Sequence, residues 1–266
     1  MKYMKHLLLL CLAAMTLQSC NLLSAAGISS QGQPTKKVEE NLTSSTANSA
    51  ENVDHSAWDA LLKKHVDNQG LVDYKGMQKD RAQLNAYLKE LSAYDPTNDW
   101  SVQELLAYYI NLYNAYTVDL ILDNYPVESI KDIDGAWTKG IVPVGNRELS
   151  LGGIENGILR KMNEPRIHFA INCASMSCPK LLREAYTAAE INEQLDRATS
   201  EFINSDKNDI TANKPKVSSI FDWYKNDYKV DGKTNVIQFI NQYSAVEINP
   251  RVPLQYKEYD WSLNKQ

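Results

Sequence analysis

Two cysteines near the middle of the chain could serve as a nucleophile, as a disulfide or in redox exchange. Cys173 and Cys178 follow an apolar run over residues 167–171, and Pro179 comes directly after the second cysteine. The run predicts a buried strand, and a proline before residues 180–184 predicts a short helix that begins there. A thiol at a helix N-terminus has a lowered pKa. Cys178 is therefore the candidate nucleophile of a hydrolase or acyl transferase.

A catalytic thiol needs a base, and His168 and Glu155 are the candidates for the catalytic roles beside Cys178. A regular strand over 166–172 sets His168 and Cys173 on opposite faces, because side chains alternate along a strand. His168 is also about 13 Å below the end of such a strand at about 3.3 Å per residue, so Cys178 would have to fold back to reach it. This geometry argues against a cysteine–histidine pair.

The sequence favours a disulfide between Cys173 and Cys178 over a catalytic thiol. The two are the only cysteines after residue 20, and disulfides persist in exported proteins. Closing so short a loop contributes about 2–3 kcal/mol and would make the corner after the strand rigid. Redox exchange through the same pair is a further alternative. No HExxH or CxxC pattern is present, so we predict neither a metal nor a cofactor.

The N-terminus has the pattern of a bacterial lipoprotein signal. Lys2 and Lys5 precede an apolar run over residues 7–15, and Ser19 precedes Cys20. We predict a signal peptide over 1–19, lipid attachment such as palmitate at Cys20, and a place in the bacterial cell envelope facing the periplasm or the exterior. A plain secretory signal or a retained anchor helix is the alternative. Residues 20–53, poor in bulky apolar side chains, predict a disordered tether, and 54–266 one globular domain.

Composition narrows the range of partners. The formal net charge is −5, and no basic run occurs along the chain, which argues against nucleic acid as a partner. An acidic protein also does not favour anionic lipid headgroups. We therefore expect the membrane to be contacted through the lipid anchor alone.

The longest predicted helix covers residues 101–124, with Ser101 as its N-cap. It is apolar on nearly all sides and should be buried at the centre of the domain. Asn111 and Asn114 lie on one face of it, where they either hold neighbouring loops or form the polar wall of a pocket. The chain has 15 tyrosines against 4 phenylalanines, a bias typical of surfaces that bind a small molecule, glycan or peptide. The candidate pocket residues are Glu104, Tyr108, Asn111, Asn114, Arg160, Arg166, Trp223 and Tyr224.

These elements predict an α+β fold. A single, mostly helical domain packs on a small β-sheet whose buried central strand is near 166–172. Residues 141–149 predict a hairpin that turns at Gly145 and Asn146. Glu155, Arg160 and Arg166 also fit a buried ion-pair network around the central strand.

Several motifs occur in a characteristic order. They are Ile110-Asn111-Leu112-Tyr113-Asn114-Ala115, Leu149-Ser150-Leu151 with Ile154-Glu155 and Leu159-Arg160, Arg166-Ile167-His168-Phe169-Ala170 with Cys173 and Cys178-Pro179, and Phe221-Asp222-Trp223-Tyr224. In this order the chain resembles the DUF547 family, from Trp58 to about Tyr228. The family often has a histidine after the Ile-Glu pair, where this chain has Asn156, so a catalytic role for that histidine does not carry over.

The resemblance implies no established activity. Some eukaryotic relatives join this domain to glutaredoxin-like modules, which is in keeping with thiol chemistry. From the sequence we therefore expect an envelope lipoprotein that is a binding or structural module with a disulfide between Cys173 and Cys178. The alternative is a thiol-dependent hydrolase or acyl transferase.

Overall fold

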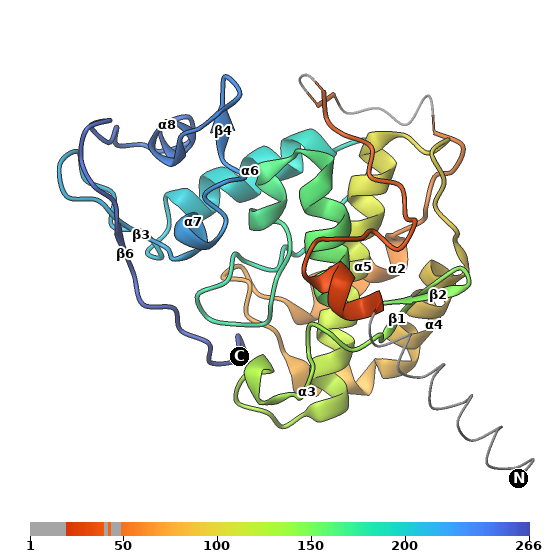
Figure 1. Ribbon diagram of the computed structural model, residues 1–266. Coiled ribbons are helices and arrows are strands. Elements are labelled where there is room, and N and C mark those ends of the chain that lie inside the picture. Colours follow the sequence, from red (N-terminus) through yellow and green to blue (C-terminus); the bar gives the residue numbers. More distant parts are fainter. Residues whose placement is uncertain (1–19, 40–41, 44–48) are drawn as a thin grey trace, which may run out of the picture.

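The computed structural model describes residues 20–39, 42–43 and 49–266, so the predicted signal peptide lies outside the described residues (Figure 1). The helices are α2 (Ser56–His65), α3 (Tyr74–Lys79), α4 (Arg81–Ala93), α5 (Val102–Asn124), α6 (Ile191–Ile203), α7 (Ile220–Trp223) and α8 (Val236–Asn241). Shorter turns are the 3₁₀ helices η1 (Ile130–Asp132), η3 (Leu159–Met162) and η4 (Pro165–Phe169), and the π-helix η2 (Gly153–Ile158). The mostly helical α+β architecture is as predicted.

Helix α5 forms the centre of the structure, surrounded by other helices (Figure 1). Its N-cap is Ser101, whose hydroxyl accepts a hydrogen bond of 3.1 Å from the backbone N–H of Glu104. The Glu104 carboxylate accepts from the N–H of Val53 at 2.9 Å instead of closing a capping box. The predicted helix over 101–124 is confirmed, and its burial on nearly all sides explains its uniformly apolar sequence.

Within the described residues, the β-strands form three two-stranded sheets rather than one small sheet. Strands β1 (Val142–Val144) and β2 (Arg147–Leu149) form the predicted antiparallel hairpin, with Gly145 at its turn in the left-handed region at φ +55°. Strands β4 (Lys229–Val230) and β5 (Lys233–Thr234) form a second antiparallel pair. Strand β3 (Lys216–Val217) pairs in parallel with β6 (Gln255–Tyr256) near the C-terminus.

The predicted central strand near 166–172 is wrong, because its first half is the 3₁₀ helix η4. Pro165 occupies the first turn, and the carboxylate of Glu164 caps it by accepting from the N–H of Arg166 at 3.1 Å. Beyond the turn, the side chain of Asn114 takes the place of a strand partner. Its oxygen accepts from the N–H of Asn172 at 2.8 Å, and its amide donates to the carbonyl of Ala170 at 3.0 Å.

The helix predicted after Pro179 is absent as well, and residues 179–187 are irregular. Asn111 holds this segment through two bonds to Tyr186, one to its carbonyl at 2.7 Å and one from its N–H at 3.0 Å. Both asparagines of α5 therefore hold neighbouring loops, because their amides satisfy backbone groups that would otherwise be buried without partners.

The N-terminal segment packs on the domain, whereas the sequence predicted a disordered tether over 20–53. Residues 20–25 form a helical turn, and the following residues run past α5 (Figure 1). The side chain of Gln33 accepts a hydrogen bond of 2.8 Å from the hydroxyl of Tyr109, and the N–H of Val38 donates to the carbonyl of Met162 at 2.8 Å. The segment packs closely because Ser24 fits against glycines of η2, where a larger side chain would collide.

The described part of the chain contains two apolar clusters. The larger surrounds α5, and the smaller contains the aromatic rings of Phe169, Phe202, Phe221, Tyr228 and Phe239. Helix η4 contributes to both, with Ile167 in the first and Phe169 in the second. Over the described residues, none of the helices combines the length and apolar character needed to cross a bilayer.

Candidate active site

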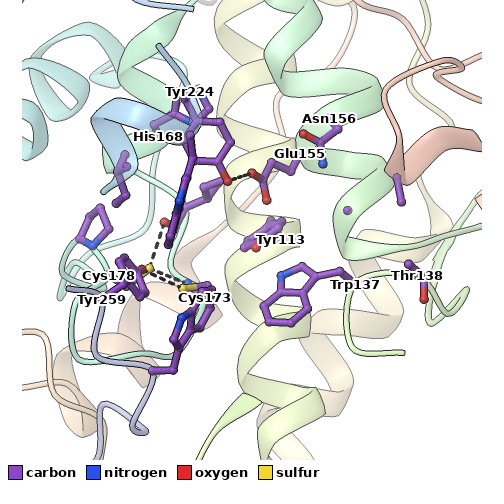
Figure 2. A pocket seen from close by; sticks show the side chains of 17 residues that line it. Tyr113, Trp137, Thr138, Glu155, Asn156, His168, Cys173, Cys178, Tyr224 and Tyr259 are labelled. Atoms are coloured by element: carbon purple, nitrogen blue, oxygen red, sulfur yellow. Dashed lines mark hydrogen bonds between the residues drawn. The ribbon is translucent and has the colours of Figure 1, made fainter. Parts of the chain in front are cut away.

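A cavity of about 400 Å³ opens beside the cysteine loop (Figure 2). Aromatic side chains from distant parts of the chain form most of its wall: Tyr113, Trp137, Trp223, Tyr224, Tyr259 and Trp261. The wall also contains polar or titratable side chains, which are Glu155, Asn156, His168, Cys173 and Cys178. An apolar cleft with a few convergent polar groups is the usual form of a small-molecule site. These five polar or titratable residues therefore lie where a ligand would sit.

Cys173 is the accessible thiol of this cavity. Its side chain is half-buried, and its sulfur lies 3.1 Å from the hydroxyl oxygen of Ser175 and 3.4 Å from that of Tyr259. A hydrogen bond from the Cys178 thiol lowers the pKa of Cys173, and the two hydroxyls act in the same direction against the effect of burial. A thiol with a lowered pKa has a larger thiolate fraction at neutral pH, and the thiolate is the nucleophile.

Cys178 has the opposite character. It is buried, and its sulfur accepts a 2.9 Å hydrogen bond from the backbone N–H of Cys173. Burial raises the pKa of Cys178 well above its ordinary value, and the neighbouring Cys173 adds to that effect. Both cysteines are free thiols in the structure, and the predicted disulfide is not formed there. The helix N-terminus that made Cys178 the favoured nucleophile is also missing.

His168 is hydrogen-bonded to Asp227, which lies 59 residues later in the chain. Its Nε2 lies 2.9 Å from an oxygen of Asp227, which also receives two hydrogen bonds, of 2.6 and 3.0 Å, from the guanidinium of Arg160. Burial opposes ionisation of Asp227, but these bonds outweigh it and hold its pKa at about 2. The ring of His168 stacks on Tyr224 with centroids 3.9 Å apart, and its buried Nδ1 has no hydrogen-bond partner.

Glu155 lines the same cavity and is hydrogen-bonded to Tyr224. The hydroxyl of Tyr224 donates a hydrogen bond of 2.5 Å to its carboxylate, and Figure 2 shows this pair above the two cysteines. Burial raises the pKa of Tyr224, and the adjacent Glu155 raises it further, so the phenol stays protonated. Glu155, His168, Cys173 and Cys178 thus line one cavity. The strand geometry that argued against such a grouping does not exist in this region.

The other residues predicted for a pocket separate into two groups. Trp223 and Tyr224 line the cavity, but Glu104, Tyr108, Asn111 and Asn114 are buried in contacts with the backbone of neighbouring segments. Arg166 pairs with Glu164 at 2.6 Å and with Asp196 at 2.7 Å, away from the cavity. The predicted network of Glu155 with Arg160 and Arg166 is therefore divided: Arg166 has partners of its own, whereas Glu155 and the guanidinium of Arg160 both contact Tyr224.

Several site residues were not found by sequence reasoning. Asp227, Tyr259 and Trp261 come from the last forty residues, and Trp137 from the irregular stretch before β1. The C-terminal segment reaches the site because its carbonyls pair with the cysteine loop: those of Asp260 and Ser262 accept from the N–H groups of Ser177 and Met176. The available signal was the density of aromatic residues in the final segment.

A comparison with known protein families finds a match in the central part of the chain. Residues 97–203 match the family described as "Protein of unknown function, DUF547". The chain contains a DUF547 domain. The matched part of the DUF547 domain begins just before α5, ends with α6, and includes Glu155, His168 and both cysteines. From outside the match, the structure adds Tyr224 and Tyr259 to the same cavity and Asp227 as the partner of His168.

No curated protein and no solved structure matches the chain. Among the described residues, no group of three or more histidine, cysteine or acidic side chains is arranged to hold a metal ion.

Proposed function

We propose that this protein is a thiol-dependent hydrolase or acyl transferase whose nucleophile is Cys173. The supporting observation is the half-buried Cys173 thiol at the cavity, with its pKa lowered by the neighbouring thiol and hydroxyls. The sequence favoured Cys178 for this role, but its burial and raised pKa make it the donor that supports Cys173. A structural thiol needs neither a cavity nor activation.

The reaction follows from these positions. The Cys173 thiolate attacks the carbonyl carbon of an ester, thioester or amide, and the carbonyl electron pair moves onto oxygen. When that pair returns, the bond to the leaving group breaks and a thioester to Cys173 remains. Water or another nucleophile then attacks the thioester and releases the cysteine.

His168 is the group that we assign to proton transfer. Asp227 takes the Nε2 side of the ring, which leaves Nδ1 as the basic nitrogen, as in other sites where an acid orients a histidine. Nδ1 would take the thiol proton and return it to the leaving group. Glu155 and Tyr224 would position the substrate, because the phenol is held by the carboxylate at the wall of the cavity.

The aromatic side chains that line the cavity indicate the class of substrate. Six aromatic rings offer stacking surfaces for a sugar, a peptide side chain or a planar group. We therefore propose a small-molecule, glycan or peptide conjugate with a cleavable acyl bond. Lipid attachment at Cys20 would keep the protein in the cell envelope, as the signal pattern at residues 1–19 supports.

Acylation by an activated ester tests this function. Wild-type protein, Cys173→Ser and Cys178→Ser are incubated with p-nitrophenyl acetate, and the peptide carrying residues 173–178 is weighed by mass spectrometry. We expect an acetyl group on Cys173 in the wild type and in Cys178→Ser, and a loss of at least about 10³-fold in turnover for Cys173→Ser. Acetylation of Cys178, or turnover unchanged in Cys173→Ser, would refute the assignment.

A binding module closed by a disulfide is the second candidate. It is supported by the hydrogen bond from the backbone N–H of Cys173 to the sulfur of Cys178, which keeps the two cysteines adjacent, and by the aromatic wall of the cavity. Alkylation under denaturing conditions, with and without reductant, decides between the two for protein taken from its native compartment. Thiols that react only after reduction favour the binding module, and thiols free without reductant favour the enzyme.

A further inference from the structure

The helical turn at residues 20–25 has its polar and apolar sides reversed. Asn21 and Ser24 face the domain and are buried, whereas Leu22 and Leu23 face outward with 57% and 45% of their surface exposed. Ile28 follows at 72% exposed. A helix on the surface of a water-soluble domain normally turns its large apolar side chains inward. The outward side of this segment therefore suits an apolar environment.

The reversal is maintained by a close fit to η2. A side chain added at Gly157 would meet the carbonyl oxygen of Ser29 at 2.5 Å and the hydroxyl of Ser24 at 2.7 Å, and one at Gly153 would meet the same hydroxyl at 2.7 Å. Only small residues allow this approach. The side chain of Gln31 also donates to that of Asn21 at 2.8 Å, which ties the turn to the following residues. Leu22 and Leu23 are thus held outward by packing.

The position of this segment in the chain identifies what covers it. Cys20, the residue with the lipoprotein pattern, is the first residue of the turn, and the apolar run of residues 7–15 precedes it. An anchor at Cys20 would put the bilayer two residues from Leu22, and an anchor that ends at Met15 would put it seven residues away. Apolar side chains next to an anchor add to its binding by entering the boundary between headgroups and acyl chains.

We propose that residues 20–28 seat the domain directly on the bilayer, with Leu22, Leu23 and Ile28 in contact with lipid. This inference rests on a membrane anchor at or before Cys20 and not on the thiol chemistry proposed for the cavity. It replaces the distance expected of a free tether: about 30 disordered residues would hold the domain on the order of 30 Å from the membrane.

The docked segment also places the cavity near the membrane. Ala25, on the same turn, lines the cavity with Trp137 and Gly152. Five residues of helix separate it from Cys20, about 8 Å at 1.5 Å per residue. The cavity wall therefore begins within two helical turns of the anchor, which suits a substrate that is itself attached to the membrane surface.

Neutron reflectometry on a supported phosphatidylcholine bilayer measures the separation directly. The protein is purified from its native membrane with its own anchor, and the mass of the chain reports lipidation separately. We compare the wild type with Leu22→Ser/Leu23→Ser/Ile28→Ser, with Gly157→Ala, and with Val246→Ser. Val246 is the matched control, because it is 46% exposed and outside the segment. Circular dichroism checks that each variant is folded.

We expect the wild-type and Val246→Ser layers to begin at the headgroups. The triple variant should show a thin hydrated gap, because it lacks the apolar contact while its segment stays packed on η2 close to the anchor. Gly157→Ala should show a wider gap that approaches about 30 Å, because the added methyl group displaces the segment and frees it as a tether. A gap in the wild type, or contact that survives in both test variants, would overturn the proposal. So would a layer two copies thick with the apolar face between them. Absence of lipid on Cys20 would refute only the lipid attachment.

Discussion

The sulfur of Cys178 accepts a hydrogen bond of 2.9 Å from the backbone N–H of Cys173, so the two cysteines of the loop have different environments. Cys173 is half-buried at the cavity, and the Cys178 thiol lowers its pKa. Cys178 is buried, and burial raises its pKa. The pair therefore contains one reactive thiol and one protected thiol.

This difference predicts selective alkylation. In the folded, reduced protein, iodoacetamide should modify Cys173 with a half-maximal rate below pH 8.5, the ordinary value for a free cysteine, because only the thiolate reacts. Cys178 should react at least about tenfold more slowly throughout that range. Peptide mass spectrometry after timed quenching gives both rates. Equal rates for the two cysteines would show that the protected environment of Cys178 does not exist.

The hydroxyl oxygen of Tyr259 lies 3.4 Å from the sulfur of Cys173, and a hydrogen bond between them stabilises the thiolate. Removing the hydroxyl in Tyr259→Phe takes away one donor to a charged group, which should raise the pKa of Cys173. The pH dependence of alkylation measures the shift. Tyr256→Phe is the control, because Tyr256 is exposed and three residues away. An unchanged profile in Tyr259→Phe would remove this tyrosine from the site.

Asn114 holds the approach to the cysteine loop through the carbonyl of Ala170 and the N–H of Asn172. Asn114→Ala leaves both backbone groups buried without partners and should lower the free energy of unfolding by about 3 kcal/mol. Asn124→Ala, at the exposed end of the same helix, should change it by less than about 0.5 kcal/mol. Urea unfolding measures both values. Similar losses in the two variants would contradict a specific role for Asn114.

Burial lowers the pKa of His55 to about 4, although Asp54 acts in the opposite direction. The folded protein holds the ring neutral, with Nδ1 2.7 Å from the hydroxyl of Tyr87, so the unfolded chain takes up a proton first as the pH falls. Stability from this group is complete above pH 6.5 and is lost toward pH 4, by about 3 kcal/mol in total.

The variant His55→Gln separates this effect from other acid-sensitive groups. It should be less stable than the wild type at pH 7, yet lose less stability between pH 6.5 and pH 4. Urea unfolding at several pH values gives the two slopes. The same slope in both proteins would show that His55 is not the group responsible.

The sequence predicted the elements whose causes lie in neighbouring residues. Ser101 begins α5 and a continuous apolar run maintains it, and Gly145 supplies the turn between β1 and β2. The family motifs likewise pointed to the cysteine loop. For such elements, capping, periodicity and turn conformation are local properties that the order of residues contains.

Tertiary structure decided the path of the chain around the site. The run after Pro165 has the apolar pattern of a strand, but its backbone partners turned out to be the side chain of Asn114 and its own carbonyls. The segment from residue 20 has the composition of a tether, but its small residues fit the glycines of η2. In both cases the partner lies far along the chain.

What the sequence alone determined is therefore the helical class of the fold, its central helix, its hairpin and the residues available for chemistry. Only the folded chain decided that Cys173 is the more exposed of the two thiols at the cavity, and that Asp227 and Tyr259 lie beside His168 and Cys173. The reason is physical: burial and hydrogen bonding set the reactivity of a thiol, and part of both comes from Tyr259, which lies 86 residues after Cys173.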